Sequence, residues 1–189
     1  ELDRAFYGPN GPHVGANAIM VRYADDLVVM ARKITPRIQL WLETVLEKSL
    51  RLRVNREKTS IVQIRKEPLN FLGFTLRYDL DLKGQGYRYL NCIPGREAVQ
   101  SLKDKLRAKT QPGCKSTLKA LIADLNPILR GWKNYFNYGY PKKAFRDLNR
   151  FVQIRISRFL RNRSQRRSTP QRQGESLFAF TRKLGLVPL

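Results

Sequence analysis

The chain has 189 residues, of which 42% are hydrophobic, so it can fill the core of one ordinary domain or two small ones. This content excludes an intrinsically disordered chain. Lys and Arg number 37 against 15 Asp and Glu, which gives a formal net charge of +22. A surplus of this size creates a positive field that favours a polyanionic partner, with nucleic acid as the first candidate.

The sequence has no apolar run of 18 residues, no signal peptide and no long basic amphipathic helix, so we expect no membrane association. Cys92 and Cys114 lie far apart, and His13, the one histidine, stands in a loop rich in Gly and Pro. This arrangement has no zinc-ligand spacing. Free, buried and reduced thiols predict the cytoplasm of a bacterium, with an organelle as the alternative.

The first half of the chain predicts both helices and strands. ELDRAF at the start predicts the end of a helix, and the apolar runs 18–23 and 27–31 predict a β-hairpin with Ala-Asp-Asp between the strands. Apolar residues at three-four spacing over 38–50 predict an amphipathic helix. Residues 61–64 and 71–82 predict strands, the second forming a hairpin with 87–93 through a turn at 83–86.

Beyond residue 94 the pattern is helical. Its first helix carries apolar residues at 99, 102 and 106, and its second begins after a predicted N-cap at Ser116. Pro127 is expected to kink or break the second helix. A third helix, over about 141–163, turns one apolar face inward. The predicted fold class is therefore α+β, with an antiparallel sheet and packed helix in residues 1–94 and an all-α bundle in residues 95–189.

Two adjacent carboxylates, Asp25 and Asp26, stand at the predicted hairpin between apolar runs. Burying an ionised carboxylate is costly unless a positive charge compensates it. Hard oxygen ligands hold Mg²⁺, which stabilises charge in phosphoryl transfer. A solvent-facing turn is the alternative, because Asp is common in turns. In a strongly basic chain, the string Tyr-Ala-Asp-Asp between two strands favours the metal site.

Four stretches follow one another along the chain: YADD (23–26), LRLRVNREKT (50–59), FLGFTL (71–76) and ILRGWKNYFNYG (128–139). The first resembles the Tyr-X-Asp-Asp motif of reverse transcriptases, and the whole set resembles group II intron reverse transcriptase/maturases. In that family the second stretch is the next palm motif, the third is the primer grip, and the fourth is the hallmark of the maturase, or X, domain that forms the thumb. The resemblance thus implies a partial palm over 1–94 and a thumb/X domain over 95–189.

The resemblance assigns catalytic roles to Asp25, Asp26 and Lys58. The aspartates would bind Mg²⁺, with Mn²⁺ as the alternative ion, and Lys58 would stabilise or protonate the pyrophosphate leaving group. The alternative for Lys58 is one of many cations on a solvated face. Arg51 and Arg56 replace the usual glycine and proline of the family motif, a departure that affects the turn around Lys58.

Primer contacts are also implied by the resemblance. Tyr23 would orient the hairpin near the primer end, with an ordinary strand residue as the alternative. Phe71, Leu72 and Gly73 would form the primer grip, where Gly73 lets a nucleic-acid backbone approach. The alternative for Gly73 is a β-bulge.

Residues 141–172 contain 11 Lys or Arg and one acid, Asp147. So dense a run of one sign destabilises a fold by self-repulsion unless a polyanion neutralises it, although a solvated face is the simpler alternative. Phosphate binding is its natural use. Trp132 is predicted to lie in the core. The predicted nucleic-acid contacts are Arg150, Arg158, Arg161, Arg163, Arg166 and Arg167.

The resemblance implies an RNA-directed DNA polymerase that uses an RNA template, an RNA–DNA primer duplex and deoxynucleotides, and that binds intron RNA to assist splicing and mobility. In the family a further metal-binding aspartate belongs to an earlier palm strand, upstream of Glu1, and Asp3 does not replace it. We therefore expect the isolated chain to be inactive as a polymerase. The alternatives are a non-catalytic RNA-binding maturase and a fragment of a CRISPR-associated or diversity-generating reverse transcriptase.

Overall fold

The computed structural model describes residues 2–8, 17–81, 84–113, 116–163 and 176–189. The chain forms two compact units, Glu1–Val62 and Gln63–Leu189. Helices and small antiparallel sheets occur in both, so the predicted mixed α+β class is confirmed. The predicted division at residue 94 follows motifs and not packing, and it stays a prediction. His13, Cys114, Arg166 and Arg167 lie outside the described residues.

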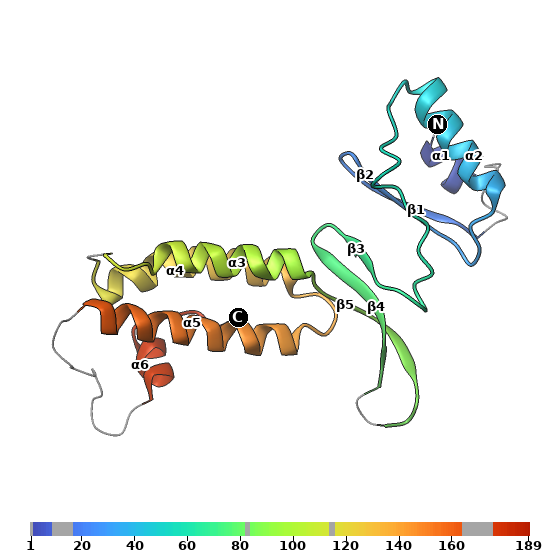
Figure 1. The fold of residues 1–189 in the computed structure, drawn as a ribbon. Helices are drawn as coiled ribbons and strands as arrows, with labels where there is room; N and C mark the ends of the chain where they lie inside the picture. Colours follow the sequence, from blue (N-terminus) through green and yellow to red (C-terminus); the bar gives the residue numbers. More distant parts are fainter. Residues whose placement is uncertain (1, 9–16, 82–83, 114–115, 164–175) are drawn as a thin grey trace. The chain divides into compact units, whose positions relative to one another are not determined.

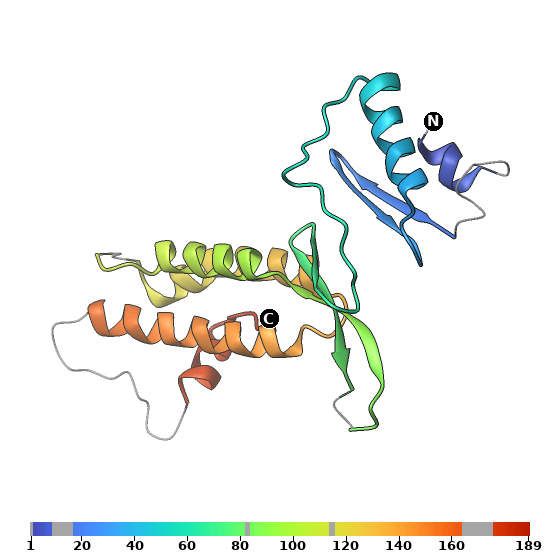
Figure 2. The ribbon, with the colours of Figure 1, turned by 45° about the vertical axis from the view of Figure 1, so that its right-hand side comes forward.

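The first unit is a β-hairpin with helices on one of its faces (Figures 1 and 2). Its elements are α1 (Leu2–Tyr7), β1 (Ile19–Tyr23), β2 (Asp26–Met30), α2 (Pro36–Thr44) and the π-helix η2 (Val45–Ser49). Thr35 caps α2, because its side chain accepts a hydrogen bond from the Ile38 amide. The core residues come from the helices and one face of the hairpin: Leu2, Ala5, Phe6, Ala18, Met20, Ile38 and Val45.

The hairpin turn is tighter than the sequence predicts. Tyr23 pairs with Asp26, so only Ala24 and Asp25 form the turn and Asp26 belongs to β2. Two-residue turns match the twist of the flanking strands but require a positive φ, which Ala24 adopts at 52°. The prediction of a three-residue Ala-Asp-Asp connection is wrong by this one residue.

The second unit contains an antiparallel sheet of order β3-β4-β5, built from β3 (Leu69–Phe71), β4 (Phe74–Leu80) and β5 (Arg88–Pro94). The predicted hairpin between β4 and β5 is confirmed. The single predicted strand over 71–82 is wrong, because the chain reverses at Leu72 and Gly73, whose φ angles are 49° and 75°. Residues 61–64 form no strand, since no described strand lies beside them to pair with.

Four helices follow: α3 (Arg96–Lys109), α4 (Leu118–Phe136), α5 (Lys142–Arg163) and α6 (Leu177–Lys183). The N-cap of α4 is Thr117 and not the predicted Ser116, because the Thr117 hydroxyl accepts from the Ala120 amide. Pro127 does not break α4, which continues through it. Leu125 and Leu129 on either side are each 1% exposed, and their burial offsets the one backbone hydrogen bond that proline cannot make.

Helices α3, α4 and α5 lie side by side, with α3 and α5 running in the same direction (Figure 1). Trp132 packs against their core, as predicted. The last residues of the chain close one side of the core, where the side-chain amide of Asn126 bonds to Gly185 and Val187, and that of Asn149 bonds to Leu189. The buried core is Leu102, Leu106, Leu121, Ile122, Leu125, Leu129, Leu148, Val152, Ile156, Phe159 and Leu186.

Candidate metal and nucleic-acid sites

The two adjacent aspartates lie at the tip of the β1–β2 hairpin. Asp25 occupies the turn and Asp26 begins β2, and both are exposed. Tyr23 and Asp26 are paired across the two strands, so their side chains lie on the same face of the hairpin. This face is opposite to the one that Met20 packs against the helices. Neither carboxylate has a hydrogen bond or ion pair with any residue that the structure describes. The hairpin thus presents two uncompensated carboxylates to solvent.

Their chemistry fits a hard divalent cation only in part. Carboxylate oxygens are the ligands that Mg²⁺ and Mn²⁺ prefer, and adjacent positions at one hairpin tip can supply two of them. Within the described ranges, no group of three or more His, Cys, Asp or Glu side chains gathers in one place. Asp25 and Asp26 could therefore hold part of the coordination shell of such an ion, with the remaining ligands coming from water or bound phosphate.

Lys58 lies in an exposed helical turn that Asn55 organises. The Asn55 side-chain oxygen accepts from the amides of Glu57 and Lys58 at 3.1 and 3.2 Å, and its carbonyl accepts from Thr59. The turn forms without the family's glycine and proline. Arg51 adopts the left-handed φ of 52°, and Arg56 pairs with Glu47. No hydrogen bond or ion pair between Lys58 and either aspartate occurs in the described part of the chain.

The Leu72–Gly73 turn is fixed by groups from two helices. The amide of Gly95, at the start of α3, donates to the Gly73 carbonyl at 2.7 Å. The hydroxyl of Tyr135, in α4, donates to the Leu72 carbonyl at 3.0 Å. With a positive φ and strands on both sides, Gly73 belongs to a hairpin turn, so the alternative of a β-bulge is wrong.

Aromatic rings fill the join between this turn and α4. Phe74 stacks on Tyr135, with ring centres 5.4 Å apart, and packs on Phe136 at 4.9 Å. A Cβ atom at Gly73 would meet Phe136 at 3.5 Å, which is an ordinary contact. Glycine is therefore favoured here by the positive φ and not by a lack of space for a side chain. The sequence motifs at 71–76 and 128–139 therefore meet in one unit, although about 60 residues separate them.

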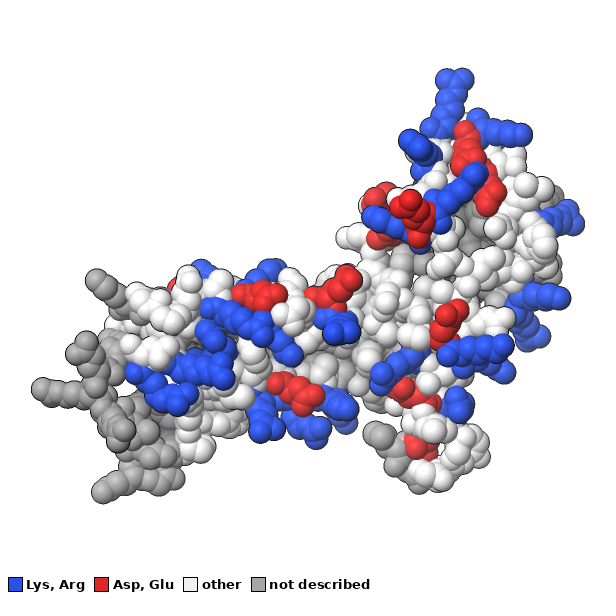
Figure 3. Space-filling model, viewed as in Figure 1, with Lys and Arg blue, Asp and Glu red and all other residues white. Residues whose placement is uncertain are grey.

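Four of the six predicted arginine contacts, Arg150, Arg158, Arg161 and Arg163, belong to α5, and Arg166 and Arg167 lie outside the described residues. Arg150, Arg158 and Arg161 are exposed, while the side chain of Arg163 is outside what the structure describes. Lys and Arg side chains cover much of the helical part in the view of Figure 3, with acidic side chains between them. These positions suit contacts with phosphate groups, which fix a nucleic acid without reading its sequence.

Three contacts in the described residues were not predicted from the sequence. They are the Tyr135 bond to the turn, and the approach of Lys103 and Arg107 to the ring of Phe151. Only the i, i+4 spacing of Lys103 and Arg107 could have indicated that two cations share one face of α3. Which residue of another helix they meet depends on how α3 and α5 pack, and spacing says nothing of that.

Residues 99–175 match a family model described as the group II intron, maturase-specific domain. This match supports a group II intron maturase region in the C-terminal part of the chain. The resemblance in the sequence is thus confirmed for the C-terminal region of the chain, where α3, α4 and α5 form the domain's described helices. No curated protein matches the chain.

The matched segment contains the GWKNYF stretch of α4 and all of α5. It also contains the sequence positions of every predicted arginine contact. The aspartate hairpin, Lys58 and the Leu72–Gly73 turn lie outside it, so their roles stay predictions. No helix within the described ranges has the combination of length and apolarity that crossing a bilayer requires.

Proposed function

We propose that the chain binds a group II intron RNA and assists its folding and splicing. The observation that carries this proposal is the maturase-specific domain over residues 99–175, whose α5 exposes Arg150, Arg158 and Arg161. A protein of net charge +22 attracts folded RNA at long range, and guanidinium groups on one helix can then contact phosphates.

The test is binding and splicing with a panel of group II intron RNAs, against length-matched RNAs of scrambled sequence. We expect tighter binding to at least one intron RNA and faster splicing of that intron at low Mg²⁺ concentration. A panel in which no intron exceeds its scrambled control in either measurement would contradict the proposal.

The salt dependence of binding tests the role of α5. The double variant Arg158→Ala, Arg161→Ala should lower the affinity and reduce the slope of log affinity against log salt by about 1 per lost phosphate contact. The matched control is Arg130→Ala, which removes an exposed arginine from α4. Equal slopes for the double variant and the wild-type chain would exclude these contacts.

A second candidate function is RNA-directed DNA synthesis, favoured by the exposed aspartate pair at the hairpin tip. In this proposal Asp25 and Asp26 hold part of a Mg²⁺ or Mn²⁺ site, Lys58 supplies a positive charge to the leaving group, and Tyr23 lies near the primer end. Phe71, Leu72 and Gly73 contact the primer strand of an RNA–DNA duplex. The bound ions would stabilise charge on the attacking and leaving oxygens.

Mn²⁺ titration followed by NMR tests this site without any need for activity. We expect paramagnetic broadening of the amide signals of residues 23–27, and its loss in Asp25→Asn, with RNA binding unchanged. The isolated chain should not extend a primer on an RNA template. Uniform broadening over the chain would contradict a metal site at the aspartates. Robust templated synthesis would contradict the expectation that a polymerase needs further carboxylates.

A further inference from the structure

Two stripes of side chains face each other where α3 packs on α5. One stripe is Lys103 and Arg107 of α3 with Thr110, its C-cap, and the other is Phe151, Arg155 and Arg158 of α5. Both have the i, i+4, i+7 spacing that places residues on one helix face. The Arg107 guanidinium lies 5.3 Å and the Lys103 ammonium 5.7 Å from the centre of the Phe151 ring. We call these six residues the α3/α5 seam.

Arg155 links the two stripes and holds the end of α3. Its Nε donates to the Thr110 hydroxyl at 2.8 Å, and its Nη2 donates to the Thr110 carbonyl at 2.9 Å. A guanidinium has five N–H donors, so three remain. Those three have no partner within the described part of the chain. A fixed guanidinium with spare donors is suited to receive an oxyanion.

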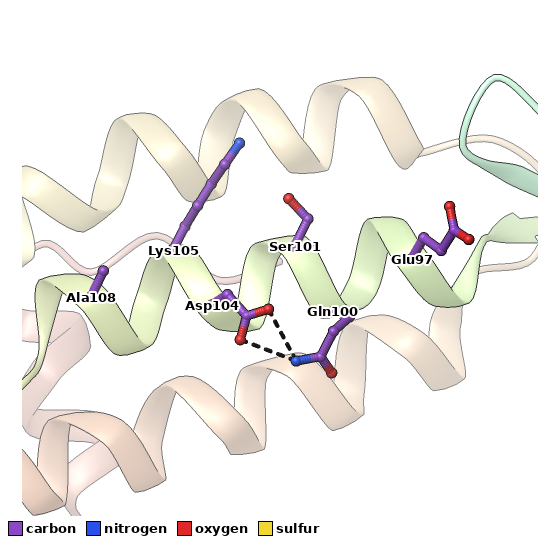
Figure 4. Close-up of a pocket in the computed structure, with 6 residues that line it drawn as sticks. All are labelled: Glu97, Gln100, Ser101, Asp104, Lys105 and Ala108. Atoms are coloured by element: carbon purple, nitrogen blue, oxygen red, sulfur yellow. Dashed lines mark hydrogen bonds between the residues drawn. The ribbon is translucent and has the colours of Figure 1, made fainter.

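The seam has more positive than negative charge around it. Among the described residues, the one acid in an ion pair with its four cations is Asp104, which accepts from Gln100 and Arg107. Figure 4 shows Gln100 and Asp104 on the same side of α3, away from Ser101 and Lys105. The Gln100 bond and then the Arg107 bond lower the pKa of Asp104, so this acid stays charged. Among the seam cations, its one ion pair within the described residues is with Arg107.

Like charges crowd the far end of the seam. Partial burial, and then the positive charges of Arg158 and Arg107, lower the pKa of the Arg155 guanidinium, which nevertheless stays protonated at neutral pH. The three guanidinium groups therefore repel one another in the free protein. A negatively charged ligand between them would remove this repulsion and occupy the free donors.

We propose that the α3/α5 seam is a phosphate-binding site for RNA, in which Arg107, Arg155 and Arg158 together hold phosphodiester oxygens of the backbone. Arg158 and Arg107 are exposed and can close on the ligand, while Arg155 is already fixed by Thr110. Guanidinium forks match phosphate geometry through paired hydrogen bonds. The ring of Phe151 backs the site and keeps the cations in place.

This inference rests on the proposed RNA-binding function, and it names a site that the exposed arginines of α5 alone do not define. Arg150 and Arg161 lie outside the seam and can contact phosphates independently of α3. A folded RNA suits the seam better than a membrane, because Arg155 is half-buried between two helices and a projecting strand reaches it more readily than a flat surface of headgroups does.

NMR of the arginine Nε–H groups in the full chain tests the site directly. The wild-type protein is titrated with inorganic phosphate, with a 12-nucleotide RNA and with phosphatidylserine vesicles, at constant ionic strength. We expect the RNA to shift the Arg107, Arg155 and Arg158 signals at lower concentration than inorganic phosphate does, while the Arg130 signal moves little. Signals are assigned by single Arg→Gln variants.

The variant Arg158→Gln should lower RNA affinity about 3- to 10-fold, as expected for one charge-assisted contact at moderate salt. It should also abolish the RNA-induced shift of Arg155. Arg130→Gln, with the same change in charge on α4, should leave both properties unchanged. Because Arg158 is exposed, neither substitution disturbs the core.

Three outcomes would overturn the inference: equal shifts of Arg130 and the seam arginines, an Arg155 shift that survives Arg158→Gln, and seam signals that respond to vesicles but not to RNA. Each is separate from failure of the proposed function, which is judged by the preference for intron RNA over scrambled RNA. If the chain prefers intron RNA but its seam signals do not shift, the proposed function stands and the phosphate site in the seam is refuted.

Discussion

The two units of the chain differ in how completely they bury their apolar surface. In the second unit, helices α3, α4 and α5 enclose a continuous core in which Leu148 and Ile156 are 0% exposed. In the first unit a single hairpin packs on short helices, and its other face leaves Ile19 at 50% and Tyr23 at 65% exposed. Both outer edges of that hairpin are unpaired within the described residues.

This difference teaches that stability and the candidate catalytic chemistry reside in different units. The unit with the closed core contains the segment that matches the maturase-specific family model. The unit with the open sheet carries the aspartate pair. An isolated two-stranded hairpin is marginal in water, so the first unit depends on the few residues that join its hairpin to its helices. Chains near 60 residues also bury a smaller share of their surface than larger domains do.

Separating the units tests the comparison with the largest expected effect. A fragment of residues 63–189 should be helical and should unfold in one cooperative thermal transition, whereas a fragment of residues 1–62 should show no sharp transition by circular dichroism. The intact chain is the control. A sharp transition in the shorter fragment would mean that its core suffices and that the contrast drawn above is wrong.

Two isoleucines of α5 test the core of the larger unit. Ile156→Ala should lower the free energy of unfolding by about 2–5 kcal/mol, because Ile156 is 0% exposed and leaves a cavity. Ile154→Ala, in the same helix at 40% exposure, should change it by about 0.5 kcal/mol or less. Urea titration measures both values. Equal losses would show that the helix is not oriented as described.

Gly139 tests the join between β5 and the helices, and Gly131 serves as its control with an expected change of opposite sign. Gly139→Ala should destabilise the chain by about 1–3 kcal/mol, since its φ is +67° and a Cβ would lie 2.2 Å from the Cys92 carbonyl oxygen. Gly131→Ala, inside α4 with open space around it, should stabilise by about 0.4–1 kcal/mol. Thermal unfolding reports both shifts, and a stabilising effect at Gly139 would refute the close approach.

The smallest expected effect concerns the thiol at the same join. Burial raises the pKa of the Cys92 thiol above its ordinary value, so the reactive thiolate forms at higher pH in the folded chain. In a Cys114→Ser background, the midpoint of the alkylation rate against pH should lie higher for native than for urea-unfolded protein. Coinciding midpoints would place Cys92 in solvent.

Most elements could be predicted from local pattern. The helix around Ile38, the three long helices and the β4–β5 hairpin all follow from apolar spacing and turn residues. The wrong predictions share one cause, which is that residues distant in sequence but packed nearby decide the local secondary structure. Residues 61–64 are rich in Ile and Val, as strands are, but they have no partner strand among the described residues. Pro127 remains inside α4 because buried leucines hold the helix.

The sequence was less informative about the sites. It correctly placed Asp25 and Asp26 at a hairpin tip, because paired apolar runs set the strands and turn chemistry set the connection. It could not place the Tyr135 hydroxyl on Leu72 or bring Arg107 toward Arg155, since both depend on how elements far apart in sequence pack. Motifs thus locate residues along the chain, while packing decides which of them act together.

The hydrogen bond from Tyr135 to the Leu72 carbonyl couples the β3–β4 turn rigidly to the C-terminal end of α4. Any force that tilts α4 is transmitted to the turn through this bond and the stacked rings of Phe74 and Tyr135. A screen for suppressors should therefore find that folding defects caused by substitutions at Leu72 or Gly73 are relieved by substitutions in α4, because the two segments move together.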